Sequence, residues 1–231
     1  MEYTRQQIID KCEEAFGDIK TFYQADIINY RGKTSDTEEY YTEIIAEFVC
    51  NNIEKYISSI PMITRKASYK TASHTGQYSE NSNRDEEIAA IKMFNQSRGG
   101  CLYDCIGEII DYQTPLKSKR DDVAGKIDLL SYDGTYLRIL ELKKPDSTET
   151  MLRCVLEGYT YMQTVNKEKL LKDFTLPEST VVKASPFVFK AGVQYIEMKE
   201  ERKWLKQLMT LLDSIPFYIV EDDGKYYVEE D

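Results

Sequence analysis

The sequence predicts an α/β fold with a mixed central β-sheet flanked by helices and an N-terminal helical extension. The first observation behind it is that residues 107–143 hold three successive segments rich in β-branched, aromatic and apolar residues. The second is that helical three- and four-residue spacing occurs on both sides of them. A third is a further apolar segment at 179–190. This order of helix, three strands, helix and strand is typical of a mixed sheet.

The chain divides into an N-terminal helical extension, residues 1–80, and a core with a C-terminal helix and short strands, residues 81–231. In the extension, apolar residues recur at steps of three and four in 4–16 and 37–57, which predicts two helices. The segment 67–85 is rich in Ser, Thr, Asn and Gly and is expected to be the loop between the two parts.

The elements of the core follow from apolar spacing and from capping residues. The expected strands are 107–116, 125–132, 135–143, 179–190, 216–220 and 225–229, and the expected helices are 84–97, 148–165 and 199–214. Ser82-Asn83 is expected to cap the first of these helices, whose first turn is acidic. Asp146-Ser147 is expected to open the second.

Composition excludes several classes of protein. No apolar run reaches about 18 residues, and the N-terminus lacks the design of a signal peptide, so we expect a cytoplasmic protein that does not span a membrane. A net charge of −10 argues against a protein that coats nucleic acid nonspecifically. The single histidine, His74, is expected in a surface loop, and it leaves His-rich metal sites without their ligands. The five scattered cysteines are expected to be reduced.

A β-hairpin is expected between residues 126 and 143. Asp133-Gly134 predicts a two-residue type I′ turn, because such a turn needs positive φ at both central positions. That turn would place Asp128 opposite Ile139. A Glu on the same face two positions beyond Ile139 would then be a diagonal neighbour of Asp128, with Cα atoms roughly 7–8 Å apart.

The alternation of side chains puts Asp128, Glu141 and Lys143 on one face of this hairpin. Two carboxylates at that separation can converge on one divalent cation, and hard oxygen ligands suit Mg²⁺ or Mn²⁺. The cation would lower the pKa of a bound water and offset the charge on a scissile phosphate. Lys143 would orient or deprotonate that water, so the three residues are the parts that phosphodiester hydrolysis needs.

The pattern of Asp128, twelve intervening residues, and then Glu141-x-Lys143 resembles the PD-(D/E)XK, or restriction-endonuclease-like, nuclease superfamily. The resemblance covers about residues 82–190 and looks closest to solitary bacterial members with an Asn-Arg-x-Glu-Glu helix and a Gly-Lys-Ile-Asp-Leu strand. It implies a restriction-endonuclease-like core and a nuclease that uses Mg²⁺ or Mn²⁺ to cut nucleic acid, in particular DNA. Since many members act in pairs, it also implies a homodimer.

The resemblance also implies further ligands. Members of this kind add a glutamate from the helix before the first strand, and we expect Glu87 rather than Glu86, because Glu87 shares a helical stripe with Ile91 and Phe94. The main-chain carbonyl of Leu142 would also touch the metal. A favourable interaction with the helix dipole is the plainer explanation for the two glutamates.

Plainer explanations stay open for other residues as well. Asp128, Glu141 and Lys143 would otherwise form a solvated polar face or a Lys–Glu ion pair, although the apolar residues on both faces of the hairpin weaken this. On the helix at 148–165, a polar side chain could reach the site, the candidates being Arg153, Glu157 and Tyr161. A surface i,i+4 pair between the first two is the commoner arrangement.

Two other functions remain open: a catalytically inactive nuclease-fold module that binds nucleic acid or a protein partner, and an interaction protein whose function lies in residues 1–80. Two basic groups could approach a phosphate backbone, namely Lys117, Lys119, Arg120 and Lys126, and Arg65, Lys66 and Lys70. Clustered loop lysines are more often simply solvated. The sequence leaves open whether the substrate is DNA or RNA.

Overall fold

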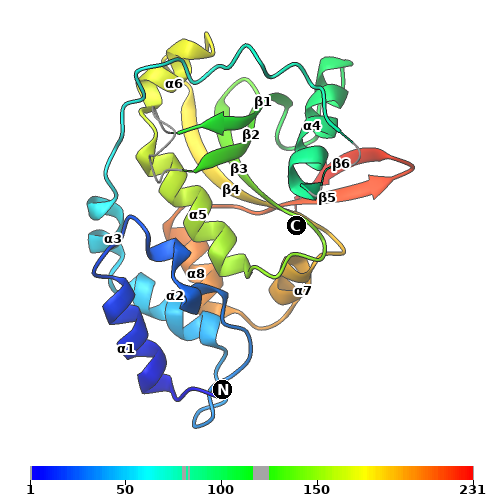
Figure 1. Ribbon diagram of the computed structural model, residues 1–231. Helices are drawn as coiled ribbons and strands as arrows, with labels where there is room; N and C mark the ends of the chain where they lie inside the picture. Colours follow the sequence, from blue (N-terminus) through cyan, green and yellow to red (C-terminus); the bar gives the residue numbers. More distant parts are fainter. Residues whose placement is uncertain (1, 80–81, 83, 117–124, 231) are drawn as a thin grey trace.

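A six-stranded mixed sheet forms the centre of the protein, seen here in a computed structural model that describes residues 2–79, 82, 84–116 and 125–230 (Figure 1). The strands lie in chain order: β1 (Glu108–Pro115), β2 (Lys126–Tyr132), β3 (Tyr136–Lys143), β4 (Val181–Phe189), β5 (Phe217–Asp222) and β6 (Lys225–Glu229). Neighbours β1 to β3 are antiparallel, β3 to β5 are parallel, and β6 is antiparallel to β5. The expected α/β class with a mixed central sheet is confirmed.

Helices of the described residues surround this sheet. They are α1 (Arg5–Ala15), α2 (Tyr41–Asn51), α3 (Ile53–Ser59), α4 (Asp85–Arg98), α5 (Met151–Thr164), α6 (Lys167–Asp173), α7 (Val193–Lys199) and α8 (Lys203–Leu211), with short 3-10 helices at Phe22–Gln24 and Asp26–Asn29. The single helix expected at 37–57 is interrupted at Asn52, which leaves the helical conformation. Neither α6 nor α7 was expected. None of these helices has the length and apolar character that crossing a membrane requires.

Two hydrophobic clusters cover the two faces of the sheet. The first joins α1, α2, α5 and α8 to sheet residues such as Leu130 and Ile139. The second joins α4 to Leu129 and Leu140 on the opposite face. Figure 1 shows α1 to α3 on the side of α5, with α4 on the other side. A strand covered on both faces is apolar along its whole length, which explains why all of β3 except its first residue is buried.

The N-terminal extension shares its core with the sheet. Ile8 of α1 and Ile44 of α2 are fully buried in the same cluster as Ile139 of β3. A border near residue 80 stays a prediction. The shared cluster means that the extension stabilises the face of the sheet on which α5 lies.

The β2–β3 hairpin has a register two residues away from the expected one. Leu130 pairs with Ile139, whereas the type I′ turn would have paired Asp128 with that residue. The turn is longer because the Asp133 carboxylate accepts hydrogen bonds from the N–H groups of Thr135 (2.8 Å) and of the next residue (2.7 Å). A shift of two leaves the alternation of faces unchanged, so the register error by itself does not alter which residues were predicted to share a face.

Two helices begin as their capping residues dictate. α1 has a capping box, in which the hydroxyl of Thr4 accepts from the N–H of Gln7 and the Gln7 side chain accepts in return. α5 starts at Thr150, whose hydroxyl accepts from an N–H of the first turn. The start expected at 146–147 was therefore wrong, because the better cap lies further along the chain.

The start of α4 also differs from the expectation. Its N-cap position is Arg84, which makes no side-chain capping bond. Ser82 instead accepts a hydrogen bond of 3.2 Å from the Arg84 N–H, and Asn83, the other expected cap, lies outside the described residues. The acidic first turn of α4 is present as expected and suits the helix dipole.

Candidate functional site

β2 and β3 separate at the end that holds the predicted site. Their pairing stops at Leu129 and Leu140, although both strands continue, β2 against β1 and β3 against β4. Beyond this point the N–H of Leu142 donates a hydrogen bond of 3.0 Å to Oδ2 of Asp128. The fork between the two strands thus holds a carboxylate where a backbone carbonyl would normally accept.

The carboxylate of Asp128 is held at both oxygens. Oδ1 accepts a hydrogen bond of 3.0 Å from the side-chain amide of Gln113 on β1, and Oδ2 accepts from Leu142. Asp128 as a whole is half-buried, and burial is the main influence on its carboxyl, raising its pKa to about 7. The Lys143 ammonium and the Leu142 N–H act in the opposite direction without reversing this.

An open pocket of about 420 Å³ lies over this fork. Its lining residues come from the start of α4, from β1 and β2, and from the position after β3: Arg84, Asp85, Glu86, Glu87, Gln113, Asp128 and Lys144. Four of these side chains are carboxylates and two are cations, so the charge of the lining suits a bound cation better than a bound anion.

Helix α4 brings Glu86, and not Glu87, onto the end of β3. Oε1 of Glu86 accepts a hydrogen bond of 3.0 Å from the Lys144 N–H, whereas Glu87 makes an ion pair of 3.1 Å with exposed Arg84. Ile91 is buried against the sheet as expected. The first turn of α4, however, contacts the end of β3. There Glu86, and not Glu87, accepts the hydrogen bond from the Lys144 N–H.

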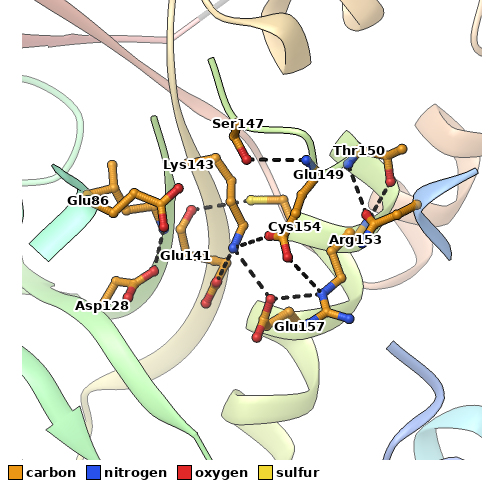
Figure 2. A network of polar contacts seen from close by, with 12 residues as sticks. Glu86, Asp128, Glu141, Lys143, Ser147, Glu149, Thr150, Arg153, Cys154 and Glu157 are labelled. Carbon is orange, nitrogen blue, oxygen red and sulfur yellow. Dashed lines mark hydrogen bonds and ion pairs between the residues drawn. The ribbon is translucent and has the colours of Figure 1, made fainter. Parts of the chain in front are cut away.

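The ammonium of Lys143 lies among three carboxylates (Figure 2). Its Nζ is 2.8 Å from Oε1 of Glu141, 2.6 Å from Oε2 of Glu149 and 3.5 Å from Oε2 of Glu157. Burial lowers the pKa of Lys143, but the charges of Glu141 and Glu157 outweigh it and raise the pKa well above its ordinary value. We call Lys143, Glu141, Glu149, Glu157 and Arg153 the lysine cluster.

Glu141 is the most confined carboxylate of the site. The residue is only 3% exposed, and its Oε2 has no hydrogen-bond partner among the described residues. Burial and the charge of Glu157 raise the pKa of Glu141 well above its ordinary value, against the effect of Lys143. Helix α5 passes very close at Gly158, where a Cβ would lie 3.3 Å from Cβ of Glu141.

Helix α5 contributes a buried pair where a surface pair was expected. Arg153 and Glu157 form an ion pair of 3.0 Å, with side chains only 13% and 10% exposed. The hydroxyl of Tyr161 donates to the other oxygen of Glu157 at 2.8 Å. Burial raises the pKa of Glu157, but Lys143 and Arg153 more than compensate, so that it is lowered overall. The polar residues of α5 therefore belong to the site.

Gln113 is a site residue that the sequence reasoning missed. It lies in β1 opposite Asp128, yet its φ of +49° is in the left-handed region, which residues other than Gly, Asn and Asp rarely adopt. Strained backbone of this kind is often found at functional sites. A glutamine within a strand carries no signal of its own, and only the β1–β2 register would have identified it. Glu149, in the loop before α5, was also missed, because its sequence position does not show that it contacts Lys143.

The structure describes only some of the basic residues that were expected to approach a phosphate backbone. Lys117, Lys119 and Arg120 lie outside the described residues. Lys126 is exposed at the start of β2, on the strand that carries Asp128. Lys70, from the second group, lines a different pocket.

The carboxylates of the site lie on two sides of β3. Figure 2 shows Glu86 and Asp128 on one side, and the lysine cluster with Glu141 on the other. Among the described residues, no three His, Cys, Asp or Glu side chains stand close enough together to hold a metal ion. Glu141 is the residue between the two groups, since its backbone belongs to the fork and its carboxylate to the lysine cluster.

Comparison with known proteins gives no match to this chain among family models, curated proteins or solved structures. The functional argument therefore starts from the geometry of the fork, the pocket above it and the lysine cluster beside it.

Proposed function

We propose that this protein is a metal-dependent nuclease that hydrolyses phosphodiester bonds, with DNA as its substrate. The observation that carries the proposal is the fork itself. There Asp128 is held at both oxygens beside Glu86, and a buried oxygen of the neighbouring Glu141 has no hydrogen-bond partner within the described part of the chain. Lys143 follows two residues later on the same strand.

Asp128 and Glu86, which line the same pocket, offer the first ligands for a divalent cation, although no three acidic side chains among the described residues stand close enough together there to hold one. A buried carboxylate oxygen without a hydrogen bond is unfavourable, and a cation is one group that would satisfy it. Burial raises the pKa values of Asp128 and Glu141, and a bound cation would favour the charged form of both carboxyls. Asp128 and Glu86 would hold Mg²⁺ or Mn²⁺ in this pocket. Glu141, the Leu142 carbonyl and Glu87 are ligands that the resemblance implies; here Glu141 lies on the side of Lys143 and Glu87 is paired with Arg84. When bound, this ion would lower the pKa of a water molecule and offset charge on the phosphate.

Residues of the chain would orient the proposed metal ligands and would supply a positive charge at the site. The Gln113 amide and the Leu142 N–H fix the orientation of Asp128, and the Lys144 N–H fixes that of Glu86. Lys143 keeps its proton at neutral pH because its pKa is raised, so it would act as a positive charge beside the phosphate and not as a general base.

The fold agrees with this proposal. Antiparallel β1 to β3, then parallel β4, with α4 on one face and α5 on the other, is compatible with the restriction-endonuclease-like core that the resemblance implies. Action as a homodimer is part of the same proposal and rests on the resemblance alone.

One observation favours a different function, a nuclease fold that binds nucleic acid or a protein without cutting. The ammonium of Lys143 is engaged by three carboxylates, as it would be in a purely structural ion-pair cluster. Under this alternative, Lys143 would contribute to stability alone.

The test is cleavage of linear, circular and single-stranded DNA, and of RNA, in Mg²⁺, Mn²⁺ or EDTA. We expect cutting that needs the metal and is lost in Asp128→Asn. Asp213→Asn is the matched control, because Asp213 is exposed and pairs with Lys183 outside the site. Cutting in EDTA, or undiminished cutting by Asp128→Asn, would overturn the proposal. Folded protein that neither cuts nor binds Mn²⁺ by calorimetry would establish the binding alternative instead.

A further inference from the structure

The only histidine of the chain lies in a loop, as expected, but its half-buried side chain is fixed against a buried acid. Nδ1 of His74 lies 2.7 Å from Oδ1 of Asp111, a residue only 3% exposed. The other oxygen of Asp111 accepts a hydrogen bond of 2.6 Å from the Thr114 hydroxyl. The imidazole also stacks on Tyr112, with ring centroids 4.6 Å apart. These contacts fix the ring and leave Nε2 as its remaining polar atom.

His74 lines a second pocket, of about 550 Å³, which plays no part in the proposed chemistry. The lining combines the cations Lys70 and Arg98 and one exposed carboxylate, Glu108, with polar and apolar side chains: His74, Thr75, Phe94, Ile109, Ile110, Phe174 and Leu176. Lys70 and Arg98 are both exposed, and each lies near an aromatic ring, with its charged group 6.0 Å and 5.7 Å from the ring centroid respectively. The pocket therefore offers an apolar wall with positive charges at its edge.

The same two elements connect this pocket to the one over the fork. Helix α4 carries Glu86 in its first turn and Arg98 in its last, which corresponds to about 18 Å along a helix axis. Strand β1 leads from Glu108 to Gln113 over about 16 Å. At the duplex spacing of about 3.4 Å per nucleotide, this is about five nucleotides, and fewer in an extended single strand.

We propose that this second pocket binds one unpaired nucleotide of the substrate strand, a few nucleotides from the scissile phosphate. The inference rests on the proposed nuclease function. The base would lie on the apolar wall with Nε2 of His74 at its edge, and its phosphate would contact Lys70 and Arg98. An unpaired base is the fitting ligand because its edges and faces are free, whereas those of a paired, stacked base are not. In a chain of net charge −10, two exposed cations beside one pocket give the strand a local point of attraction.

The first test measures binding of a fluorescein-labelled 15-nucleotide single strand by anisotropy at several salt concentrations. All proteins carry Asp128→Asn, so that the strand is not cut. We expect Arg98→Gln and Lys70→Gln each to raise Kd several-fold and to reduce the slope of log Kd against log salt by about 0.7. The matched control is Lys203→Gln, since Lys203 is also exposed and lies 5.0 Å from an aromatic ring. Equal Kd values and slopes in all three variants would overturn the proposal.

The second test asks whether a base occupies the pocket. Single strands with one abasic position, moved along the sequence, should lose affinity for the Asp128→Asn protein most strongly at one place. Leu176→Ser, which makes part of the half-buried wall polar, should reduce that loss. A loss of affinity that does not depend on position, or equally tight binding of the matched duplex, would overturn the unpaired-nucleotide assignment. Metal-dependent cutting by the wild-type protein is measured separately, so failure here is distinguishable from failure of the nuclease proposal.

Discussion

Oδ2 of Asp128 accepts a hydrogen bond of 3.0 Å from the backbone N–H of Leu142. This bond exists because β2 leaves β3 after the pair of Leu129 and Leu140, so that the next N–H of β3 needs another acceptor. The separation of β2 from β3 thus creates the fork and also orients the Asp128 carboxylate within it. The raised pKa of Asp128 is the electrostatic consequence of holding a charge at this position.

The stability of the metal-free protein should depend on the ionisation of Asp128. Burial raises the pKa of this carboxyl from 3.8 to about 7, so the folded state binds its proton more tightly than the unfolded state does. The resulting stabilisation is complete below pH 4 and is lost as the pH rises to about 7. We expect Asp128→Asn to be more stable than wild type by about 1–3 kcal/mol at pH 8 and about equal to it at pH 4. Urea unfolding in EDTA at both pH values measures this, and parallel pH profiles would refute it.

Divalent cations should stabilise the wild-type protein. A ligand that binds only the folded state at 100 times its Kd adds about 2.7 kcal/mol to the free energy of unfolding. Thermal unfolding with Mg²⁺ or Mn²⁺ should therefore give a higher Tm for wild type and for the control Asp213→Asn. Asp128→Asn should show little change. An equal shift in all three proteins would mean that the cation binds elsewhere.

The strands and the main site residues could be predicted from the sequence because they rest on local patterns. Glu141 and Lys143 lie together on the side of α5, as alternation along β3 predicts. Asp128, in contrast, lies at the fork on the side of Glu86, where β2 and β3 separate. The turn between the two strands was assigned incorrectly. The error arose from Asp133, whose side chain bonds two N–H groups and lengthens the turn. Such a bond between side chain and backbone competes with the backbone preference from which the turn type was inferred.

The other residues of the site depend on contacts between distant parts of the chain. Gln113 meets Asp128 only through the pairing of β1 with β2, and His74 meets Asp111 across a long loop. Arg153 and Glu157 were assigned to the surface because their spacing is that of an ordinary surface pair. Only the packing of α5 on β3 turns this pair toward Lys143, and helical spacing does not contain that information.

Gln113 should affect activity and stability in opposite directions. Its φ of +49° favours glycine, so Gln113→Gly should keep or raise the free energy of unfolding, by up to about 1 kcal/mol. The same change removes the amide that holds Oδ1 of Asp128 and should lower kcat about tenfold. Glu38→Gly is the matched control, since Glu38 is exposed and has a φ of 56°. It should have the same effect on stability and none on cutting. A loss of both activity and stability in Gln113→Gly would make Gln113 a structural residue only.

Lys143 should contribute to stability as well as to cutting. Lys143→Met leaves the buried carboxylate of Glu141 without a cation and removes one of the two cations beside Glu157, which should cost about 3–5 kcal/mol at pH 8. Lys183→Met, which removes one member of a partly exposed pair with Asp213, should cost less than about 1 kcal/mol. Adding Glu157→Gln to Lys143→Met should recover part of the loss, because it removes a negative charge that repels the now unpaired Glu141, but should not restore cutting. Equal losses in the two single lysine variants, measured by urea unfolding, would show that the three carboxylates do not depend on Lys143. Restored cutting in the double variant would remove Lys143 from the proposed chemistry.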